Sequence, residues 1–236
     1  MKLVCISDTH GFHPFLDMPE GDVLIHCGDW CKDFGNVQEM KAFADWVEAL
    51  PYASKIVIAG NHDFPAQDND ARCKGNFKKR GIHYLKDSGV EIDGQVFWGS
   101  PWQPEFGGLA FNLPRGERLW DKWRRIPLNT DVLVTHGPPF GILDNATSPE
   151  DLFGQDNPVG CRQLLRRVKQ VRPKVHCFGH VHVSPGVVDQ GETTFINAAI
   201  CKGHLSMGSK PTRQAAEKFG GLREPIVFDL PESNES

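Results

Sequence analysis

The sequence has no apolar run long enough to cross a lipid bilayer and no excess of positive charge. We therefore expect no contact with a membrane. The formal net charge of −4 gives no overall basic field of the kind that draws proteins onto nucleic acid, so nucleic acid is not an expected partner. Residues Met1–Ser7 run directly into a polar motif and leave no room for a signal peptide, which predicts a cytoplasmic protein.

The cysteines form no pattern typical of a disulfide framework or a zinc ribbon. There are seven, an odd number, and Cys27 and Cys31 stand close together without a second pair to complete a tetrahedral zinc site. Others, such as Cys5 and Cys177, lie inside apolar runs, where a reduced and buried thiol is expected. The cysteines favour a reducing compartment and predict no metal site of their own.

Internal repeats, low-complexity tracts and abrupt changes of composition are absent as well. A length of 236 residues with 39% hydrophobic residues is enough to bury one sizeable core. We therefore predict a single domain over residues 1–230, followed by a polar C-terminal tail at residues 231–236.

Short apolar runs alternate with segments of helical periodicity along the chain. Nearly continuous apolar strands joined by helices are typical of α/β proteins, whose strands are covered on both faces. Asn36 followed by Glu39 predicts the start of a helix that ends before Pro51. Strands are predicted at residues 2–7, 22–27, 55–59, 131–135, 174–178 and 225–230, hairpins at 90–99 and 186–197, and helices at 37–50, 117–125 and 162–171.

Three segments are less regular. Residues 68–80 are polar and are predicted to form a surface helix or loop. Residues 100–115 are rich in proline, glycine and aromatic residues, which predicts an ordered loop rather than a linker. Residues 202–223 are polar and show no periodicity that assigns them to a helix or strand.

Polar side chains follow five of the predicted strands, at the points where these strands end. Taken singly, each cluster is explained by turn chemistry or by a structural histidine. All five together are not, because α/β layers place their sites at the carboxyl ends of the strands. The groups are ligands of borderline divalent metals and are too many for one tetrahedral ion. The clusters, which predict a site for two metal ions, are Asp8/His10, Asp29, Asn61–Asp63, His136 and His180/His182.

The order of these motifs resembles the full signature of the calcineurin-like metallophosphoesterases. The matching elements are Asp8-x-His10, Gly28-Asp29, Gly60–Asp63, His136 and Gly179-His180-x-His182. Longer segments resemble, more narrowly, the metallophosphoesterase-domain-containing (MPPED) proteins, which are similar to class III cyclic nucleotide phosphodiesterases. These segments lie at residues 7–10, 22–26, 55–62, 99–104, 111–116 and 135–139.

The resemblance implies a four-layer α/β/β/α sandwich and a role for each ligand position. The implied metal ligands are Asp8, His10 and His182 for one ion, Asn61, His136 and His180 for the other, and Asp29 as a bridge between both ions. His62 would lie outside both ligand sets. The chain departs from the MPPED proteins at residues 63–86, which are shorter, and at residues 202–221, which resemble a longer or different insertion. Both segments could border the substrate entrance.

Two divalent ions about 3.5–4 Å apart can share a hydroxide and bind phosphoryl oxygens, which allows in-line attack on phosphorus without a covalent intermediate. His62 is the predicted catalytic acid that protonates the leaving group. Asp63 is predicted either to act with it, by orienting the His62 ring, or to cap the segment that follows. Manganese is the expected metal, with iron and zinc as alternatives for the same ligands.

Aromatic and basic residues in the proline-rich loop are the candidates for substrate contact. Trp102, Phe106 and Phe111 could stack on a nucleobase or could pack the loop onto the protein. Arg115 could meet a phosphate or lie on the surface. Two further histidines are expected in the core or behind the metal ligands, where they could orient them. They are His26 and His176.

The expected function is hydrolysis of small organic phosphodiesters, with cyclic nucleotides as the class that the resemblance implies. A phosphomonoesterase of the same fold and a weakly catalytic, partner-binding scaffold are the alternatives, while a nuclease fits poorly with the acidic charge balance. A protein Ser/Thr phosphatase is disfavoured because Gly28-Asp29 continues as Trp30-Cys31-Lys32 and not as Asp-Arg-Gly. The expected partner is a small-molecule phosphoester, and no oligomeric state is predicted.

Overall fold

The computed structural model describes residues 1–147, 157–202, 211–218 and 221–231. Within these residues a sheet of five strands has the order β13-β1-β2-β3-β4. Strands β1 to β4 are parallel, and β13 joins the edge beside β1 in the antiparallel direction. The strands are β1 (Lys2–Ile6), β2 (Val23–His26), β3 (Ser54–Val57), β4 (His83–Tyr84) and β13 (Ile226–Asp229).

A second sheet has the order β11-β12-β10-β9-β6-β5. Its four inner strands are parallel, whereas each edge strand forms an antiparallel hairpin with its neighbour. The strands are β5 (Ser88–Ile92), β6 (Gln95–Ser100), β9 (Val132–Thr135), β10 (Val175–Phe178), β11 (Gly186–Asp189) and β12 (Thr194–Asn197). The short strands β7 (Gln103–Pro104) and β8 (Asn112–Leu113) pair with each other in the loop between β6 and α4.

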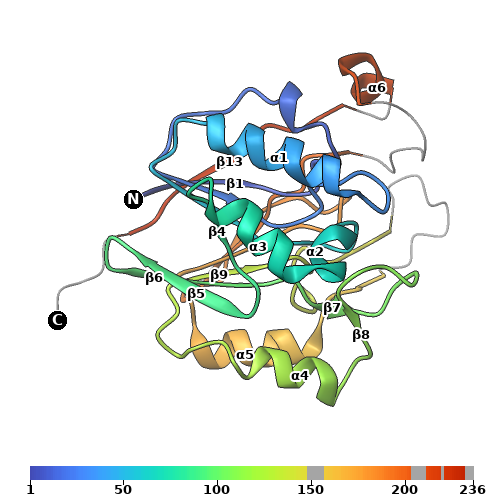
Figure 1. The fold of residues 1–236 in the computed structure, drawn as a ribbon. Coiled ribbons are helices and arrows are strands. Elements are labelled where there is room, and N and C mark those ends of the chain that lie inside the picture. The colour runs from blue at the N-terminus through green and yellow to red at the C-terminus, as the bar shows by residue number, and fades with distance from the viewer. Residues whose placement is uncertain (148–156, 203–210, 219–220, 232–236) are drawn as a thin grey trace.

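Helices cover the outer face of each sheet (Figure 1). The chain on the first sheet includes α1 (Val37–Ala49), α2 (Phe64–Asp68), α3 (Asp70–Lys78) and the 3₁₀ turn at His13–Phe15, while α4 (Glu117–Trp123) and α5 (Arg162–Val171) cover the second sheet. The start of α1 follows from its sequence, because the Asn36 side chain accepts a hydrogen bond from the Glu39 amide at 3.0 Å. The remaining helix is α6 (Arg213–Lys218).

Three apolar layers hold this arrangement together. Leu3, Ile25 and Val134 belong to the layer between the two sheets. Phe43 of α1 packs in the layer outside the first sheet, and Trp123 of α4 packs in the layer outside the second. The predicted α/β/β/α sandwich is therefore confirmed.

The predicted elements are present with small shifts at their ends. The Asp93-Gly94 turn of the first hairpin has φ angles of 48° and 74°, as expected for a tight two-residue turn. Residues 68–80, predicted as helix or loop, contain the whole of α3. Of the unassigned polar segment, α6 is described, but residues 203–210 and 219–220 lie outside the described residues, as does most of the predicted tail.

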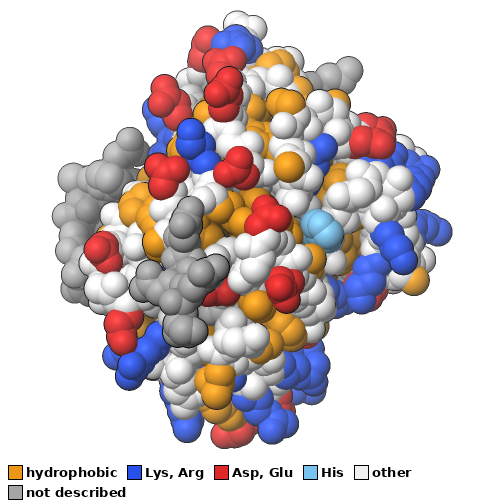
Figure 2. Space-filling view, turned by 90° about the vertical axis from the view of Figure 1, so that its left-hand side faces the viewer, with side chains coloured by type: hydrophobic (Ala, Val, Ile, Leu, Met, Phe, Trp, Pro, Cys, Tyr) orange, Lys and Arg blue, Asp and Glu red, His pale blue; other side chains and the backbone are white. Residues whose placement is uncertain are grey.

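All seven cysteines are free and buried, which confirms the prediction made for those in apolar runs, such as Cys5 and Cys177. The Sγ atoms of Cys5 and Cys177 lie 3.4 Å apart across the layer between the sheets. None of the helices in the described parts of the chain is long and apolar enough to span a bilayer. Figure 2 shows the face at the left of Figure 1, where charges of both signs are mixed with apolar side chains.

Candidate metal centre

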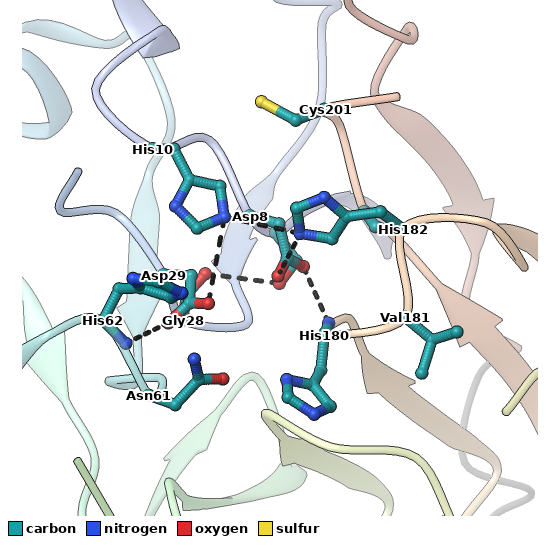
Figure 3. A network of polar contacts seen from close by, with 12 residues as sticks. Asp8, His10, Gly28, Asp29, Asn61, His62, His180, Val181, His182 and Cys201 are labelled. Carbon is teal, nitrogen blue, oxygen red and sulfur yellow. Dashed lines mark hydrogen bonds and ion pairs between the residues drawn. The ribbon is translucent and has the colours of Figure 1, made fainter. Parts of the chain in front are cut away.

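The five polar clusters lie together at the carboxyl ends of the parallel strands. Figure 3 shows Asp8, His10, Asp29, Asn61, His62, His180 and His182 around one centre. The two sheets meet here, since Ser7 forms a parallel bridge with Ala199 and its carbonyl accepts the Ile200 amide at 2.9 Å. Strands β1, β2 and β3 supply residues from one sheet, and β9 and β10 supply residues from the other. The residues that the structure brings to this place are Asp8, His10, Asp29, Asn61, His62, His136, His180 and His182.

Asp8, His10 and His182 form a compact group of possible ligands. Their ligand atoms all lie within 4.8 Å of one another. Asp8 Oδ1 is 3.1 Å from His182 Nε2, and His10 Nε2 is 3.4 Å from the same nitrogen. His10 Nδ1 lies 3.2 Å from the carbonyl of Cys31, to which it can only donate. That contact fixes the tautomer and leaves the Nε2 lone pair of His10 facing the group.

Asn61, His136 and His180 gather beside this first group. Asn61 Oδ1 lies 2.9 Å from His136 Nε2, and the rings of His136 and His180 have centroids 5.1 Å apart. His136 Nδ1 is 2.9 Å from the carbonyl of Cys27, so the other ring nitrogen points to the centre. The second predicted set of ligands is thus assembled from strands of both sheets.

The carboxylate of Asp29 lies between the two groups. Its Oδ2 atom is 3.3 Å from His136 Nε2 and 3.9 Å from His10 Nε2. Its Oδ1 atom accepts the backbone amide of His62 at 2.7 Å, which fixes the orientation of the carboxylate. This is the position that a bridging ligand requires.

The backbone is strained at four of the candidate ligands. Asp8, His10, Asp29 and His180 have φ angles of 53°, 42°, 57° and 68°, in the left-handed region that non-glycine residues rarely adopt. Such strain costs on the order of 1 kcal/mol or more at each position and gathers at functional sites. Its concentration at these strand ends supports a functional role.

Two glycines leave the room that these side chains occupy. A Cβ atom on Gly60 would lie 2.3 Å from Asp29 Oδ1, and one on Gly179 would lie 2.1 Å from Asp8 Oδ2. Neither glycine can be replaced without moving a carboxylate. The motifs Gly60-Asn61 and Gly179-His180 therefore have a steric reason for their first residue.

Burial and neighbouring charges set the protonation of the group. Burial lowers the pKa of His10 to about 3 and that of His180 to about 4, so both rings are neutral at neutral pH. Burial also acts to lower the pKa of His136, but the Asp29 carboxylate outweighs it and raises the pKa to about 9. For Asp29, burial acts to raise the pKa, yet His136 and the other rings hold it well below its usual range. The donor set is suited to divalent ions, which would displace the proton of His136.

His62 lies at the edge of the first group. Its ring meets the ring of His10 edge-on with centroids 4.9 Å apart, and its Nδ1 atom contacts the backbone carbonyl of Asp33. The partner that orients this ring is therefore a carbonyl, which sequence could not indicate because any residue supplies one. The role of His62 as the acid stays a prediction.

Asp63 does not orient the His62 ring, contrary to one of the two sequence-based interpretations. Its Oδ2 atom accepts the amides of Asp29 and Gly60 at 2.8 and 2.7 Å, and Oδ1 accepts the amide of Cys31 at 2.8 Å. Asp63 does occupy the N-cap position of α2, as the alternative interpretation predicted, but its side chain makes no cap hydrogen bond to that helix. Asp63 instead holds the loop that carries Asp29 against the loop that carries Asn61.

The stacking roles proposed for Trp102 and Phe111 are not supported by their positions. Phe111 is fully buried, so it offers no face to a substrate. Trp102 packs edge-on against Phe111, with centroids 5.6 Å apart, and donates its indole N–H to Asp87 at 2.9 Å. Lys122 Nζ covers the Trp102 ring at 3.9 Å. These two aromatic residues pack the loop onto the protein.

The other two candidates for substrate contact, Arg115 and Phe106, have different surroundings. The Arg115 guanidinium donates to the carbonyls of Val159 and Gly160, each at 2.7 Å, and so joins two loops. Phe106, by contrast, is 64% exposed and meets the ring of His180 edge-on with centroids 6.4 Å apart. Of the three aromatic candidates in this loop, Phe106 is the one with an exposed ring beside a candidate ligand.

Contacts around the site settle the positions of the two further histidines, His26 and His176. His26 Nε2 pairs with the Thr9 hydroxyl at 3.0 Å, so this histidine supports the ligand loops without touching a ligand. His176 lies in the core, where Nε2 pairs with the Thr135 hydroxyl at 2.8 Å. Within the segment that departs from the MPPED proteins, Pro211 lies beside Gly11, since a Cβ atom on Gly11 would be 3.2 Å from its Cγ atom.

Comparison with known proteins identifies the family. The sequence profile of the Calcineurin-like phosphoesterase family matches residues 1–184. The chain is 38% identical over 255 aligned positions to human "Metallophosphoesterase domain-containing protein 1", covering 98% of this chain and 71% of that protein. It is 40% identical over 223 positions to a UPF0046 protein of Caenorhabditis elegans, covering 89% of this chain and 73% of the relative.

Solved structures of similar fold are more distant in sequence. The phosphopantetheinyl hydrolase of Mycobacterium tuberculosis matches with a TM-score of 0.57 at 14% identity, over 100% of this chain and 98% of that chain. A protein of Thermus thermophilus, TT1561, matches with a TM-score of 0.58 at 13% identity, over 83% and 88%. These likenesses show the shared fold. With the family profile, the curated relatives and the assembled ligand groups in agreement, the chain belongs to the calcineurin-like phosphoesterase family of metal-dependent phosphoesterases.

Proposed function

We propose that the protein is a dinuclear-metal-dependent phosphodiesterase that hydrolyses small organic phosphodiesters, with cyclic nucleotides as the first class to test. The observation that carries this proposal is the position of the Asp29 carboxylate between two groups of ligand atoms. One set, Asp8, His10 and His182, lies beside it, and the other comes from Asn61, His136 and His180. Metal ions in these sites would supply an activated water and bind the phosphoryl oxygens.

His62 and Asn61 would contribute to catalysis in different ways. His62 has its Nδ1 atom committed to the Asp33 carbonyl, so Nε2 is the nitrogen that can pass a proton to the leaving alkoxide. The position of His62 beside His10 favours that role. Asn61 contributes a neutral oxygen, which lowers the negative charge that an anionic diester must approach.

The exposed ring of Phe106 favours a diester over a monoester. It offers an apolar surface next to His180, at a distance where an organic group attached to the phosphate could rest. A diester carries two such groups and a monoester carries one. The proposal therefore predicts that the second ester group adds to the rate.

The test is a comparison of two chromogenic substrates with purified protein and added manganese. We expect bis-p-nitrophenyl phosphate to be hydrolysed faster than p-nitrophenyl phosphate. The reverse ranking would contradict the diesterase proposal and favour a phosphomonoesterase. Fewer than two ions per chain under saturating metal would reject the dinuclear site. A panel of cyclic AMP, cyclic GMP, their 2',3' isomers and simple monoesters then narrows the substrate class.

A further inference from the structure

Arg223 reaches from the end of the chain to a predicted metal ligand. Its Nη2 atom donates to the backbone carbonyl of His182 at 2.8 Å. Its Nη1 atom donates to the carbonyl of Cys201 at 2.8 Å and to that of Ala199 at 3.3 Å. The backbone amide of Arg223 adds a bond to the carbonyl of Ile200 at 2.9 Å.

The loop that carries His182 is held from a second direction by Asn197. This buried side chain donates to the carbonyls of Val181 and Ser184, each at 2.9 Å. Asn197 thus fixes the residues on either side of His182, whereas the carbonyl of His182 itself is bound by Arg223. Removing the Arg223 guanidinium leaves the Asn197 contacts in place, so the loop loses one constraint and keeps its overall course.

The three hydrogen bonds of the Arg223 guanidinium described above go to neutral carbonyls. Hydrogen bonds with a charged donor are stronger than neutral ones, and the planar fork of arginine can hold several acceptors in one fixed geometry. The positive charge of Arg223 therefore strengthens the hydrogen bonds that hold three backbone carbonyls beside the candidate metal centre.

We propose that Arg223 is a positioning residue that holds His182 in place for metal binding. By fixing the His182 carbonyl it sets where the ring stands, with Nε2 3.1 Å from Asp8 Oδ1 and 3.4 Å from His10 Nε2. This inference rests on the proposed metal site and adds a residue 41 positions away from the ligand that it serves. Residues that orient ligands from behind typically change metal affinity by about 10- to 100-fold.

The experiment compares Arg223→Met and Arg223→Lys with the wild-type protein after metal removal. Manganese binding is followed by calorimetric titration and by electron paramagnetic resonance, which separates a single ion from a coupled pair. In Arg223→Met we expect one of the two sites to bind manganese about 10- to 100-fold more weakly. The electron paramagnetic resonance signal of a coupled pair of ions then appears only at a high manganese concentration. At that concentration turnover should return close to the wild-type value. Arg223→Lys keeps the positive charge but lacks the planar fork of the guanidinium. Its manganese affinity at that site should lie between those of Arg223→Met and the wild type.

Arg167→Met is the matched control, since Arg167 also donates to a backbone carbonyl, that of Ile126, but in the helical layer outside the second sheet. Its metal affinities should equal those of the wild type. Wild-type affinity at both sites in a folded Arg223→Met protein would overturn the inference. If that variant does not fold, wild-type affinity in Arg223→Lys overturns it equally. Absence of two-ion binding or of hydrolysis in the wild type would instead reject the proposed function.

Discussion

At the scale of single residues, His62 shows how one backbone contact assigns two ring nitrogens to different tasks. A carbonyl only accepts hydrogen bonds, so the contact with Asp33 commits Nδ1 of His62 as a donor. Nε2 is then the atom that gains and loses a proton. The ligand atoms of His10, Asp29 and His62 lie within 4.8 Å of one another, so the His62 ring stands close enough to join a metal site. In its predicted role as the acid, outside both ligand sets, its removal should affect proton transfer more than metal binding.

For His62→Ala we therefore expect two bound metal ions per chain and a loss of turnover of about 10²- to 10⁴-fold on diesters with poor leaving groups. Diesters of p-nitrophenol, whose leaving group needs little protonation, should lose much less. Metal content and steady-state rates on both kinds of substrate provide the measurement. Equal loss on both substrates would show that His62 does not act as the acid.

His176 provides a separate, pH-dependent case at the same scale. The Thr135 hydroxyl donates to the carbonyl of Gly137 at 2.8 Å, so it accepts from Nε2 of His176, and Nδ1 is left buried without a partner. Burial lowers the pKa of His176 to about 3 from an ordinary value of 6.5. Below pH 6.5 the unfolded chain therefore binds a proton at this residue that the folded protein does not bind. The free energy of unfolding decreases as the pH is lowered through that range.

In His176→Gln the amide can still donate to Thr135 but cannot be protonated. Between pH 6.5 and pH 4 the wild type should lose about 1 kcal/mol more of unfolding free energy per pH unit than this variant. Urea unfolding of both proteins in chelator, at several pH values, measures the difference. Parallel stability curves would show that His176 is protonated in the folded state.

At the scale of elements, the backbone at the carboxyl ends of the strands determines where the candidate ligands stand. The Gly179 position at the end of β10 illustrates this, because a Cβ atom there would lie 2.1 Å from both Asp8 Oδ2 and Ser7 Oγ. In Gly179→Ala we expect at least a 10-fold loss of metal affinity together with a destabilisation of about 1–3 kcal/mol from overpacking. Gly75→Ala in α3, where a Cβ atom would meet nothing within 4 Å, should be neutral or slightly stabilising. Metal titration and urea unfolding test both, and wild-type affinity in Gly179→Ala would contradict the steric argument.

The elements themselves could be predicted from sequence because their signals are local. Apolar runs, the Asn36 cap and the Asp93-Gly94 turn each depend on neighbouring residues, and so does the polar cluster that follows a strand. The direction of the Asp63 side chain could not be predicted, because the amides of Asp29 and Cys31 that bind it come from another strand end. For the same reason the sequence left open whether the aromatic residues of the loop stack on a substrate or pack the loop, since burial of Phe111 depends on its tertiary contacts.

At the scale of the whole molecule, the candidate ligands come from both sheets, which also meet through apolar packing and through the bridge between Ser7 and Ala199. Asp29 and Asn61 follow strands of the first sheet, whereas His136 and His180 follow strands of the second. Metal ions bound between them would stabilise the folded state as a whole. A proton on His136 would compete with a metal ion for the ring nitrogen. Because the pKa of His136 is about 9, the metal affinity should rise with pH up to that value.

We expect added manganese to raise the melting temperature of the metal-free protein in a concentration-dependent way. At about 100 times the dissociation constant each site adds about 2.7 kcal/mol, which for a chain of this size corresponds to roughly 5–10 °C. Thermal unfolding with chelator and with increasing manganese measures the shift. His136→Ala should show a smaller shift than the wild type, and a melting temperature independent of manganese would reject metal binding between the sheets.

The burial of every cysteine makes the intact protein a poor target for thiol reagents. Each of the seven thiols is enclosed by folded structure, so a labelling reagent can reach it only after some part of the protein opens. Cys5 and Cys177 would report separation of the two sheets, and Cys73 would report loosening of the helix α3 that covers the first sheet. The native thiols thus provide internal probes that distinguish which layer opens first.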